Sequence, residues 1–277
     1  MASANVRRVS MSSPPFFLIT LLDNYWHQLI GWIIDVNRRS LLQLPMQENR
    51  RQMPMDVQTP RKASGSATGR GRKRDRERTR QEILDVAFQE FAEKGLSGTN
   101  TDVIAARANI TKRLVFYYFN TKEKLFTAVL EEAYAKMRDA ERDLRLDELE
   151  PETAIRTLAE FTFDFDNDNP EFVRLVTIEN IHRGRHLTKS LKARAMTRPI
   201  IAQIERVLAR GEKAGVIRSG IDPVELHMTL SSLCFFSVAN RHTFQPQFGY
   251  DMTSKRARRQ RRTQISDLLW LYVRKDA

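Results

Sequence analysis

The sequence predicts an all-α protein, with a small N-terminal helical domain followed by a larger helical domain. From residue 81 onward, apolar residues recur three and four positions apart, which is the period of an amphipathic helix. Gly, Pro, Asn and Asp interrupt this pattern where helices would end or begin. A third observation is the stretch 101–125, which reads as two short helices joined by a tight turn, with another helix starting at once.

The composition of the chain bounds its class. The 277 residues, 41% of them hydrophobic, are enough for two ordinary domains with cores of their own. A net charge of +12 and a pI near 10.1 indicate a polyanionic partner, which could be nucleic acid or an anionic membrane. The single cysteine, Cys234, cannot form an internal disulfide, and this fits a reducing cytoplasm.

Residues 1–74 are unlike the rest of the chain. The apolar-rich segment Phe16–Val36 is about long enough for a membrane span, which needs roughly 20 residues, but Asp23 and Asp35 interrupt it. It could be a signal peptide, a helix on a membrane surface, or sequence that is not native to the protein. We favour the last interpretation, with the true start at one of three methionines: Met46, Met53 or Met55. Residues 52–71 are predicted to be a disordered linker, because they offer almost nothing to bury.

The first predicted helix of the small domain covers residues 81–94. Its apolar residues share one stripe: Ile83, Leu84, Ala87, Phe88 and Phe91. Gly95 is predicted to end it, because glycine readily adopts the left-handed conformation that follows many helices.

Two short helices then follow within residues 101–125. Ile104 and Ala108 lie four apart on the first, and Asn109 interrupts the pattern. Asn tolerates a left-handed backbone better than most residues, which suits a tight turn between helices. Thr111 is expected to cap the second helix, whose buried face would carry Val115 and Phe119.

The remaining residues of the second short helix suit a DNA groove. Cations, hydroxyls and flat rings are combined there: Lys112, Arg113, Leu114, Phe116, Tyr117 and Tyr118. Lysine or arginine can bind guanine O6 and N7, and a leucine can cover a thymine methyl group. We expect Thr111 to Leu114 to contact bases. We expect Thr101, Tyr117, Tyr118 and Lys122 to contact phosphates.

This stretch resembles the helix-turn-helix domain of the tetracycline-repressor (TetR) family, whose pattern is T-x-x-x-I-A-x-x-A-G-V-S-x-x-x-L-Y-x-x-F-x-x-K-E-x-L. The matching residues are Thr101 (slightly offset), Ile104, Ala105, Ala108, Ile110, Thr111, Val115, Phe116, Phe119, Lys122, Glu123 and Leu125. Asn109 replaces the usual glycine. Phe116 replaces the usual tyrosine and so lacks a hydroxyl that often reaches a phosphate in the family. Three helices of an unrelated bundle are the alternative interpretation.

The resemblance implies a DNA-binding transcriptional regulator of the repressor type, which a small-molecule effector releases from its operator. It implies a helix-turn-helix domain over residues 75–125 and a ligand-binding and dimerisation domain over 126–277. From their composition, residues 1–74 are read as an extension that is disordered or not native to the protein and ends in a basic arm. It further implies a cytoplasmic homodimer on double-stranded DNA with a pseudo-palindromic operator, and no catalytic site, metal or cofactor. The seven cations between Arg70 and Arg80 are then interpreted as an arm that follows the DNA backbone or enters the minor groove.

The rest of the chain predicts further helices, over roughly 122–146, 151–165, 170–184, 187–214, 224–240 and 256–273. The 187–214 segment is expected to break near Pro199. Asp222 is expected to cap the 224–240 helix. The run 164–169 is read as a turn, and the segment 244–252 as a loop. By resemblance, the last two helices form a four-helix interface with a second copy. The alternative is that they only complete the core of one copy.

An effector pocket needs mostly apolar walls and a few polar groups. The candidate walls are Phe161, Phe165, Phe172, Leu175, Met228, Phe235 and Phe236, and the candidate polar groups are Glu179, Asn180, His182 and Asn240. Glu179, His182 and His186 could also share a helix face as metal ligands, but Gly184 and the absence of an HExxH pattern favour ordinary polar residues at a helix end. Two other functions stay open. One is a metal-dependent hydrolase that uses these residues and His227, and the other is a regulator tethered to a membrane by Phe16–Val36.

Overall fold

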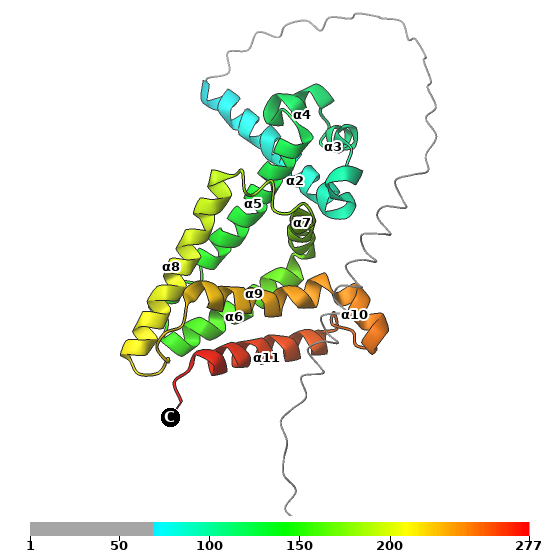
Figure 1. Cartoon of the computed structure of the whole chain (residues 1–277). Coiled ribbons are helices and arrows are strands. Elements are labelled where there is room, and N and C mark those ends of the chain that lie inside the picture. The colour runs from blue at the N-terminus through cyan, green and yellow to red at the C-terminus, as the bar shows by residue number, and fades with distance from the viewer. Residues whose placement is uncertain (1–68, 277) are drawn as a thin grey trace, which may run out of the picture. The chain divides into compact units, whose positions relative to one another are not determined.

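The computed structural model describes residues 69–276, and it describes side chains from residue 74 onward except at position 194. The predictions for residues 1–68, including Phe16–Val36, the three candidate start sites and most of the linker, lie outside the described residues. The described part is helical (Figure 1). Its elements are α2 (Gly69–Gly98), α3 (Thr101–Arg107), α4 (Lys112–Phe119), α5 (Lys122–Arg142), the 3-10 turn η1 (Leu146–Glu148), α6 (Pro151–Asp168), α7 (Pro170–Ile181), α8 (Leu191–Lys213), α9 (Pro223–Ala239), α10 (Arg241–Phe248) and α11 (Lys255–Val273).

The first core gathers the apolar stripes of α2, α3, α4 and the start of α5. Its largest fully buried side chains include Ile83, Phe91, Ile104, Leu125 and Phe126. The rings of Phe91 and Phe126 meet edge to face, with centroids 5.1 Å apart. The helical period of the sequence therefore predicted the members of this core that α2 to α5 supply, because each of these helices carries its apolar residues on one face.

Gly95 interrupts α2 as predicted. Its φ of 69° lies in the left-handed region, which glycine adopts without a steric penalty. The beginning of α2 differs from the prediction. Residues 69–80 are helical and continue α2 toward the N-terminus, so this helix begins before residue 81, where the sequence placed its start. The contact of this basic segment with DNA stays a prediction. Arg80 lies over the ring of Phe119 at 5.4 Å, which ties this basic extension to the end of α4.

The second core lies among α6, α8, α9 and α11. Leu158, Ile204, Leu230 and Ile265 are each buried in it. Helix α6 packs along α11, and α9 crosses α6 and α8 (Figure 1). Asp222 caps α9 as predicted, since its Oδ1 accepts hydrogen bonds from the backbone N–H groups of Val224 and Glu225 at 2.8 and 2.9 Å.

Three predicted interruptions were wrong. The run 164–169 is not a turn, because α6 continues to Asp168 and buries Asp166. Helix α8 passes through Pro199, at the cost of one backbone hydrogen bond. Part of the predicted loop after residue 240 is the short helix α10, which is held to α9 by the edge-to-face contact of Phe244 with Phe236, at 5.9 Å between centroids.

The two predicted domains share a core. Helix α5 crosses the predicted boundary at residues 125/126, and α7 packs on α2. Leu175 of α7 is buried among the side chains of α2 to α5, with Ile178 and Leu187 beside it. Movements of α7 must therefore affect the packing of α2 and α5. None of the helices within residues 69–276 has the length and apolar character that a membrane span requires.

Candidate DNA-binding surface and ligand cavities

Two asparagines set the geometry of the α3–α4 pair. Asn100 caps α3, and its Oδ1 accepts a hydrogen bond from the N–H of Asp102 at 2.8 Å. Asn109 has a φ of 53°, so it takes the left-handed conformation that the sequence predicted for this turn. Helix α4 therefore begins immediately after a tight turn.

Helix α4 has one buried and one exposed side. Val115 and Phe119 are buried, as predicted. The exposed side carries five of the predicted DNA-contacting residues: Thr111, Lys112, Arg113, Phe116 and Tyr117. Leu114 and Tyr118 are half-buried between the two sides. An exposed stripe with cations at its start and aromatic residues one turn later suits entry into a DNA groove, as the sequence indicated.

The two cations at the start of α4 differ in their partners. Lys112 Nζ lies 2.8 Å from Asp102 Oδ2, in an ion pair that is about half exposed. Arg113 is exposed and forms no ion pair with any described residue. Arg113 can therefore bind a base without giving up a partner, whereas Lys112 must first exchange Asp102.

Glu90 fixes α3 against α2. Its side chain is only 2% exposed, and it binds Lys94 at 2.7 Å and also Arg107 of α3. The hydrogen bond from Lys94, aided by Arg107, holds the pKa of Glu90 below its ordinary value. The Thr99 hydroxyl adds to this joint by donating toward the backbone oxygens of Glu90 and Gly95, at 3.0 and 2.7 Å. The sequence did not show this hub, because its members are far apart along the chain.

Two predicted phosphate contacts need revision. Thr101 is only 7% exposed and lies at the start of α3, so its side chain does not belong to the exposed surface. Lys122 donates a hydrogen bond from Nζ to the backbone oxygen of Thr99 at 3.0 Å. An ammonium group has three donors, so Lys122 can brace this loop and still bind a phosphate.

Lys122→Ala is expected to weaken binding to all DNA sequences alike, because a phosphate contact carries no sequence information. The log–log slope of affinity against salt should fall by about 1. Lys136→Ala is the matched control, because Lys136 is an exposed lysine four turns further along α5, paired with Asp85 at 3.5 Å. Titrations at several salt concentrations would measure both slopes. An unchanged slope in Lys122→Ala would remove this residue from the DNA-binding surface.

Glu179 is not available to a ligand. It is 2% exposed, and its Oε1 accepts hydrogen bonds from the backbone N–H groups of His186 and Leu187 at 2.7 and 3.0 Å. Its Oε2 lies 2.6 Å from Nδ1 of His186, whose ring contacts Phe126 edge to face at 5.1 Å. Glu179 therefore fastens the segment after α7 to α7, and His186 carries this link to the core of the small domain. The prediction that Glu179 belongs to the effector pocket is corrected accordingly.

The other predicted pocket residues do not form one cavity. Phe165, Phe172 and Phe235 do gather, in a cluster with Tyr134, and Phe161 adjoins Phe165. Leu175 belongs to the small-domain core, and Met228 is 54% exposed. The other predicted polar groups lie near the surface, where Asn180 and Asn240 donate to backbone oxygens one turn earlier and His182 stays half-buried. No group of three or more potential metal ligands gathers within residues 69–276.

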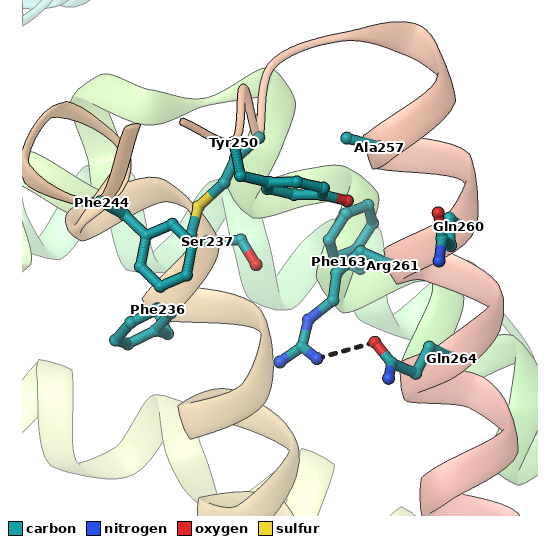
Figure 2. A pocket seen from close by; sticks show the side chains of 10 residues that line it. Phe163, Phe236, Ser237, Phe244, Tyr250, Ala257, Gln260, Arg261 and Gln264 are labelled. Carbon is teal, nitrogen blue, oxygen red and sulfur yellow. Dashed lines mark hydrogen bonds between the residues drawn. The ribbon is translucent and has the colours of Figure 1, made fainter. Parts of the chain in front are cut away.

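A cavity of about 430 Å³ lies among α6, α9, α10 and α11 (Figure 2). Aromatic rings form much of its wall: Phe163, Phe236, Phe244 and Tyr250. Arg261 lies in it, but its guanidinium already donates to Gln264 Oε1 at 3.0 Å and to the Leu233 backbone oxygen at 3.4 Å. The sequence missed this cavity because it depends on α10, which was predicted as a loop.

Large apolar side chains are exposed along α9 and α11. They are Val224, Met228 and Phe236 on α9, and Leu268, Leu271 and Tyr272 on α11, each between 42% and 55% exposed. Side chains of this size on two packed helices form a surface that a second protein chain could cover.

Asp166 is a buried ionisable group in the larger domain, and His227 is a half-buried one. Burial, and next the charge of Glu141, raise the pKa of Asp166 to about 7 from its ordinary value of 3.8. Burial lowers the pKa of His227 to about 4, so this imidazole is neutral at physiological pH. Asp166 lies four residues after the buried Thr162, so both side chains are on the same face of α6. This spacing could have predicted from the sequence that Asp166 is buried.

The raised pKa of Asp166 predicts a pH-dependent stability. Between pH 4 and 7 the folded state holds a proton that the unfolded state has lost, so this group's contribution decreases as the pH rises through that window. Asp166→Asn should therefore raise the free energy of unfolding above that of wild type more at pH 8 than at pH 5. The gain at pH 8 should be at most about 4 kcal/mol. Urea unfolding at both pH values would measure this gain. Asp164→Asn is the control, because Asp164 is about 42% exposed and paired with Arg262. An equal gain at both pH values would contradict the prediction.

Comparison with known protein families covers both parts of the described chain. The family profile "Bacterial regulatory proteins, tetR family" matches residues 83–129, and "Tetracyclin repressor-like, C-terminal domain" matches residues 151–269.

This chain matches two curated relatives over most of their lengths. The HTH-type transcriptional repressor NicS of Pseudomonas putida is 37% identical over 190 residues, which are 69% of this chain and 90% of NicS. The HTH-type transcriptional repressor SCO4008 of Streptomyces coelicolor is 31% identical over 160 residues, which are 58% of this chain and 78% of that protein.

Solved structures share the fold at lower sequence identity. The fatty acid degradation regulator FadR of Bacillus halodurans aligns with a TM-score of 0.54 and 18% identity, covering 69% of this chain and 94% of FadR. The ketosteroid transcriptional regulator KstR2 of Mycobacterium tuberculosis aligns with a TM-score of 0.53 and 19% identity, covering 71% of this chain and 95% of KstR2.

Proposed function

Because this chain belongs to the TetR family of DNA-binding transcriptional regulators, we propose that it is a repressor that binds a pseudo-palindromic operator as a homodimer. The proposal rests above all on the exposed stripe of α4, where Arg113 has no competing ion pair among the described residues. Lys112, Phe116 and Tyr117 extend that stripe. Both curated relatives described above are named as repressors, which supports this direction of control.

The exposed apolar side chains on α9 and α11 are the proposed dimer interface. One helix-turn-helix unit seldom covers enough DNA for tight specific binding, whereas two units related by a two-fold axis read two half-sites. In a two-fold interface the same patch faces itself, and a patch such as Met228, Leu268 and Leu271 can then bury its apolar surface against its copy. On this proposal the protein acts in the cytoplasm on double-stranded DNA, and it performs no catalysis.

We further propose that a small-molecule effector bound in the larger domain releases the DNA. A ligand that prefers one arrangement of the two DNA-binding units must shift DNA affinity by the same coupling free energy with which DNA shifts ligand affinity. Helix α7 is the proposed connection, because Leu175 and the Glu179–His186 pair join it to the core that positions α4. If α7 moves, α2 and α5 must shift with it, because their side chains pack against Leu175.

A reporter assay tests the repressor proposal. The DNA upstream of this protein's own gene would drive the reporter, with and without the protein. Repression is the expected result, and Arg113→Ala should abolish it while the protein level stays the same. Increased expression would instead identify an activator. No response in this assay, together with no DNA retained by the purified protein, would contradict the proposal.

A further inference from the structure

The cavity among α6, α9, α10 and α11 is preformed by the chain itself. Its volume of about 430 Å³ lies within the usual range of small-molecule sites. The segment between α10 and α11 supplies one wall, with Tyr250 and Met252. Asp251 holds this segment, because its Oδ1 accepts hydrogen bonds from the backbone N–H and the hydroxyl of Thr253 at 2.8 and 2.6 Å. A ligand would therefore enter a site whose walls are already in place.

The one charged side chain that lines this cavity, among the described residues, is Arg261. Two neighbouring arginines of α11 bind carboxylates of α6: Arg258 pairs with Asp168 at 2.6 Å, and Arg262 pairs with Asp164 at 2.8 Å. Arg261 forms no ion pair with any described residue. No carboxylate is among the described side chains that line the cavity, so the charge of Arg261 is uncompensated there.

The hydroxyl group of Ser237 on α9 also lacks a partner. Ser237 is only 8% exposed, lines the cavity and forms no hydrogen bond with any described side chain or backbone group. A serine in a helix often donates to the backbone oxygen four residues earlier, as Ser232 does to Met228 at 2.8 Å. The corresponding oxygen for Ser237, that of Leu233, accepts from Arg261 instead. Because an unpaired buried hydroxyl is costly, Ser237 indicates a partner from outside the described chain.

Hydrogen-bond donors and aromatic rings therefore meet in one cavity (Figure 2). A guanidinium has five N–H donors and no acceptor, and the bonds from Arg261 to Gln264 and to the Leu233 backbone oxygen leave three of them. We propose that the cavity binds a small planar aromatic carboxylic acid, with its carboxylate at Arg261 and Ser237 and its ring among the aromatic walls. The binding site stands on these contacts, and only its role as the effector site rests on the proposed function.

A carboxylate suits the polar side of the cavity better than a neutral or cationic group. Carboxylates bind a guanidinium through two parallel hydrogen bonds and neutralise its charge. A cationic ligand would add a second positive charge beside Arg261. Asp166 lies in the same region, since it and Arg261 both act on the pKa of Cys234, but Asp166 is 4% exposed and does not line the cavity. Its raised pKa of about 7 keeps Asp166 protonated at pH 6, where it does not oppose an anion.

A flat ring suits the opposite walls. Aromatic rings attract one another in edge-to-face and offset arrangements, beyond the apolar area that they bury. Phe236 and Phe244 already adopt the edge-to-face arrangement, with centroids 5.9 Å apart. An apolar cavity of about 150 Å³ holds one benzene molecule. The present cavity, at about 430 Å³, therefore has room for two fused rings and a carboxylate.

The cavity also contacts the helices through which the proposed function would act. Gln264 of α11 lines both the cavity and the adjoining groove that carries Leu268 of the proposed dimer interface. On α9, Val238 follows Ser237 and packs with Phe172 of α7. A ligand that changes the spacing of α9 and α11 would therefore act on the dimer interface and on α7 together.

Three probes of similar size test the ligand class: naphthoate, naphthamide and decalincarboxylate, which are an aromatic anion, its neutral amide and a saturated anion. In calorimetric titrations of the full chain at pH 6, naphthoate should bind at least about tenfold more tightly than naphthamide, which corresponds to about 1.4 kcal/mol. Decalincarboxylate should bind roughly two- to tenfold more weakly than naphthoate, because it lacks a flat ring. Absence of naphthoate binding, or equal affinity for naphthamide, would overturn the proposal. Equal affinity for decalincarboxylate would overturn the aromatic part of it.

Two pairs of variants locate the binding site. Arg261→Gln should weaken naphthoate binding at least about tenfold and remove its advantage over naphthamide. Arg259→Gln is the control, because Arg259 is exposed on the same helix and does not line the cavity. Ser237→Ala should weaken naphthoate binding roughly three- to tenfold. Ser232→Ala, which removes a hydroxyl that already has a partner on α9, should leave the affinity unchanged.

Both test variants are expected to fold. Arg261 is partly exposed and binds only an exposed amide and a backbone oxygen, and Ser237→Ala removes a single atom that has no partner among the described residues. Circular dichroism would establish folding. Wild-type naphthoate affinity in folded Arg261→Gln would place the ligand elsewhere and overturn the proposal, and wild-type affinity in Ser237→Ala would remove the hydroxyl from the site. Since these titrations contain no DNA, their failure would leave operator binding, measured separately, as the test of the proposed function.

Discussion

Arg113→Ala is expected to cost the dimer about 2–6 kcal/mol of operator affinity, since each half-site loses one base contact worth about 1–3 kcal/mol. Arg113 is exposed on α4 and has no ion-pair partner among the described residues. The variant should bind non-specific DNA nearly as well as wild type and lose discrimination at one base position of each half-site. Binding titrations with the operator and with single-base variants would measure both effects.

Lys112→Ala is the matched comparison for Arg113→Ala. Lys112 must give up its ion pair with Asp102 before it can bind a base, and an exposed pair of this kind is worth about 0–1 kcal/mol. We therefore expect a smaller loss from Lys112→Ala. If Arg113→Ala keeps the wild-type base preference at every position, α4 does not read the operator.

The second large effect is expected at the dimer interface. Replacing Leu268 and Leu271 together by aspartate places two carboxylates in each copy of a surface that must become dry. The double variant should sediment as a monomer and lose at least about a hundredfold in operator affinity, because one half-site alone supports only weak binding.

Leu191→Asp is the control for the double variant. Leu191 is 77% exposed on α8, outside the α9–α11 surface, so the same kind of substitution should leave both the dimer and operator binding unchanged. A double variant that remains dimeric by sedimentation would show that these helices only complete the core of one copy. Circular dichroism would establish that both variants are folded.

The parts of the structure that follow from local spacing could be predicted from the sequence. The buried face of α4, with Val115 and Phe119, depends only on a four-residue spacing. The turn at Asn109 depends only on the tolerance of asparagine for a positive φ. The α9 cap at Asp222 depends on one side chain and the two backbone groups that follow it.

The parts that depend on distant partners could not be predicted. Glu179 was assigned to a ligand because a buried carboxylate needs a partner, and only the fold shows that His186 and two backbone groups supply it. Asp166 was placed in a turn because acidic runs often end helices, whereas packing of α6 against α9 extends the helix through it. The helical conformation of residues 69–80 escaped prediction because a dense run of cations is usually solvated coil.

Selection of binding sites from a pool of random double-stranded DNA tests the central claim most directly. The full chain should enrich an inverted repeat, with half-sites about one helical turn or slightly more apart, as expected for two α4 helices related by a two-fold axis. Arg113→Ala in the same experiment should lose the preference at one symmetric pair of positions. Enrichment of no sequence, or of a site without two-fold symmetry that Arg113→Ala selects equally well, would contradict a homodimer that reads DNA with α4.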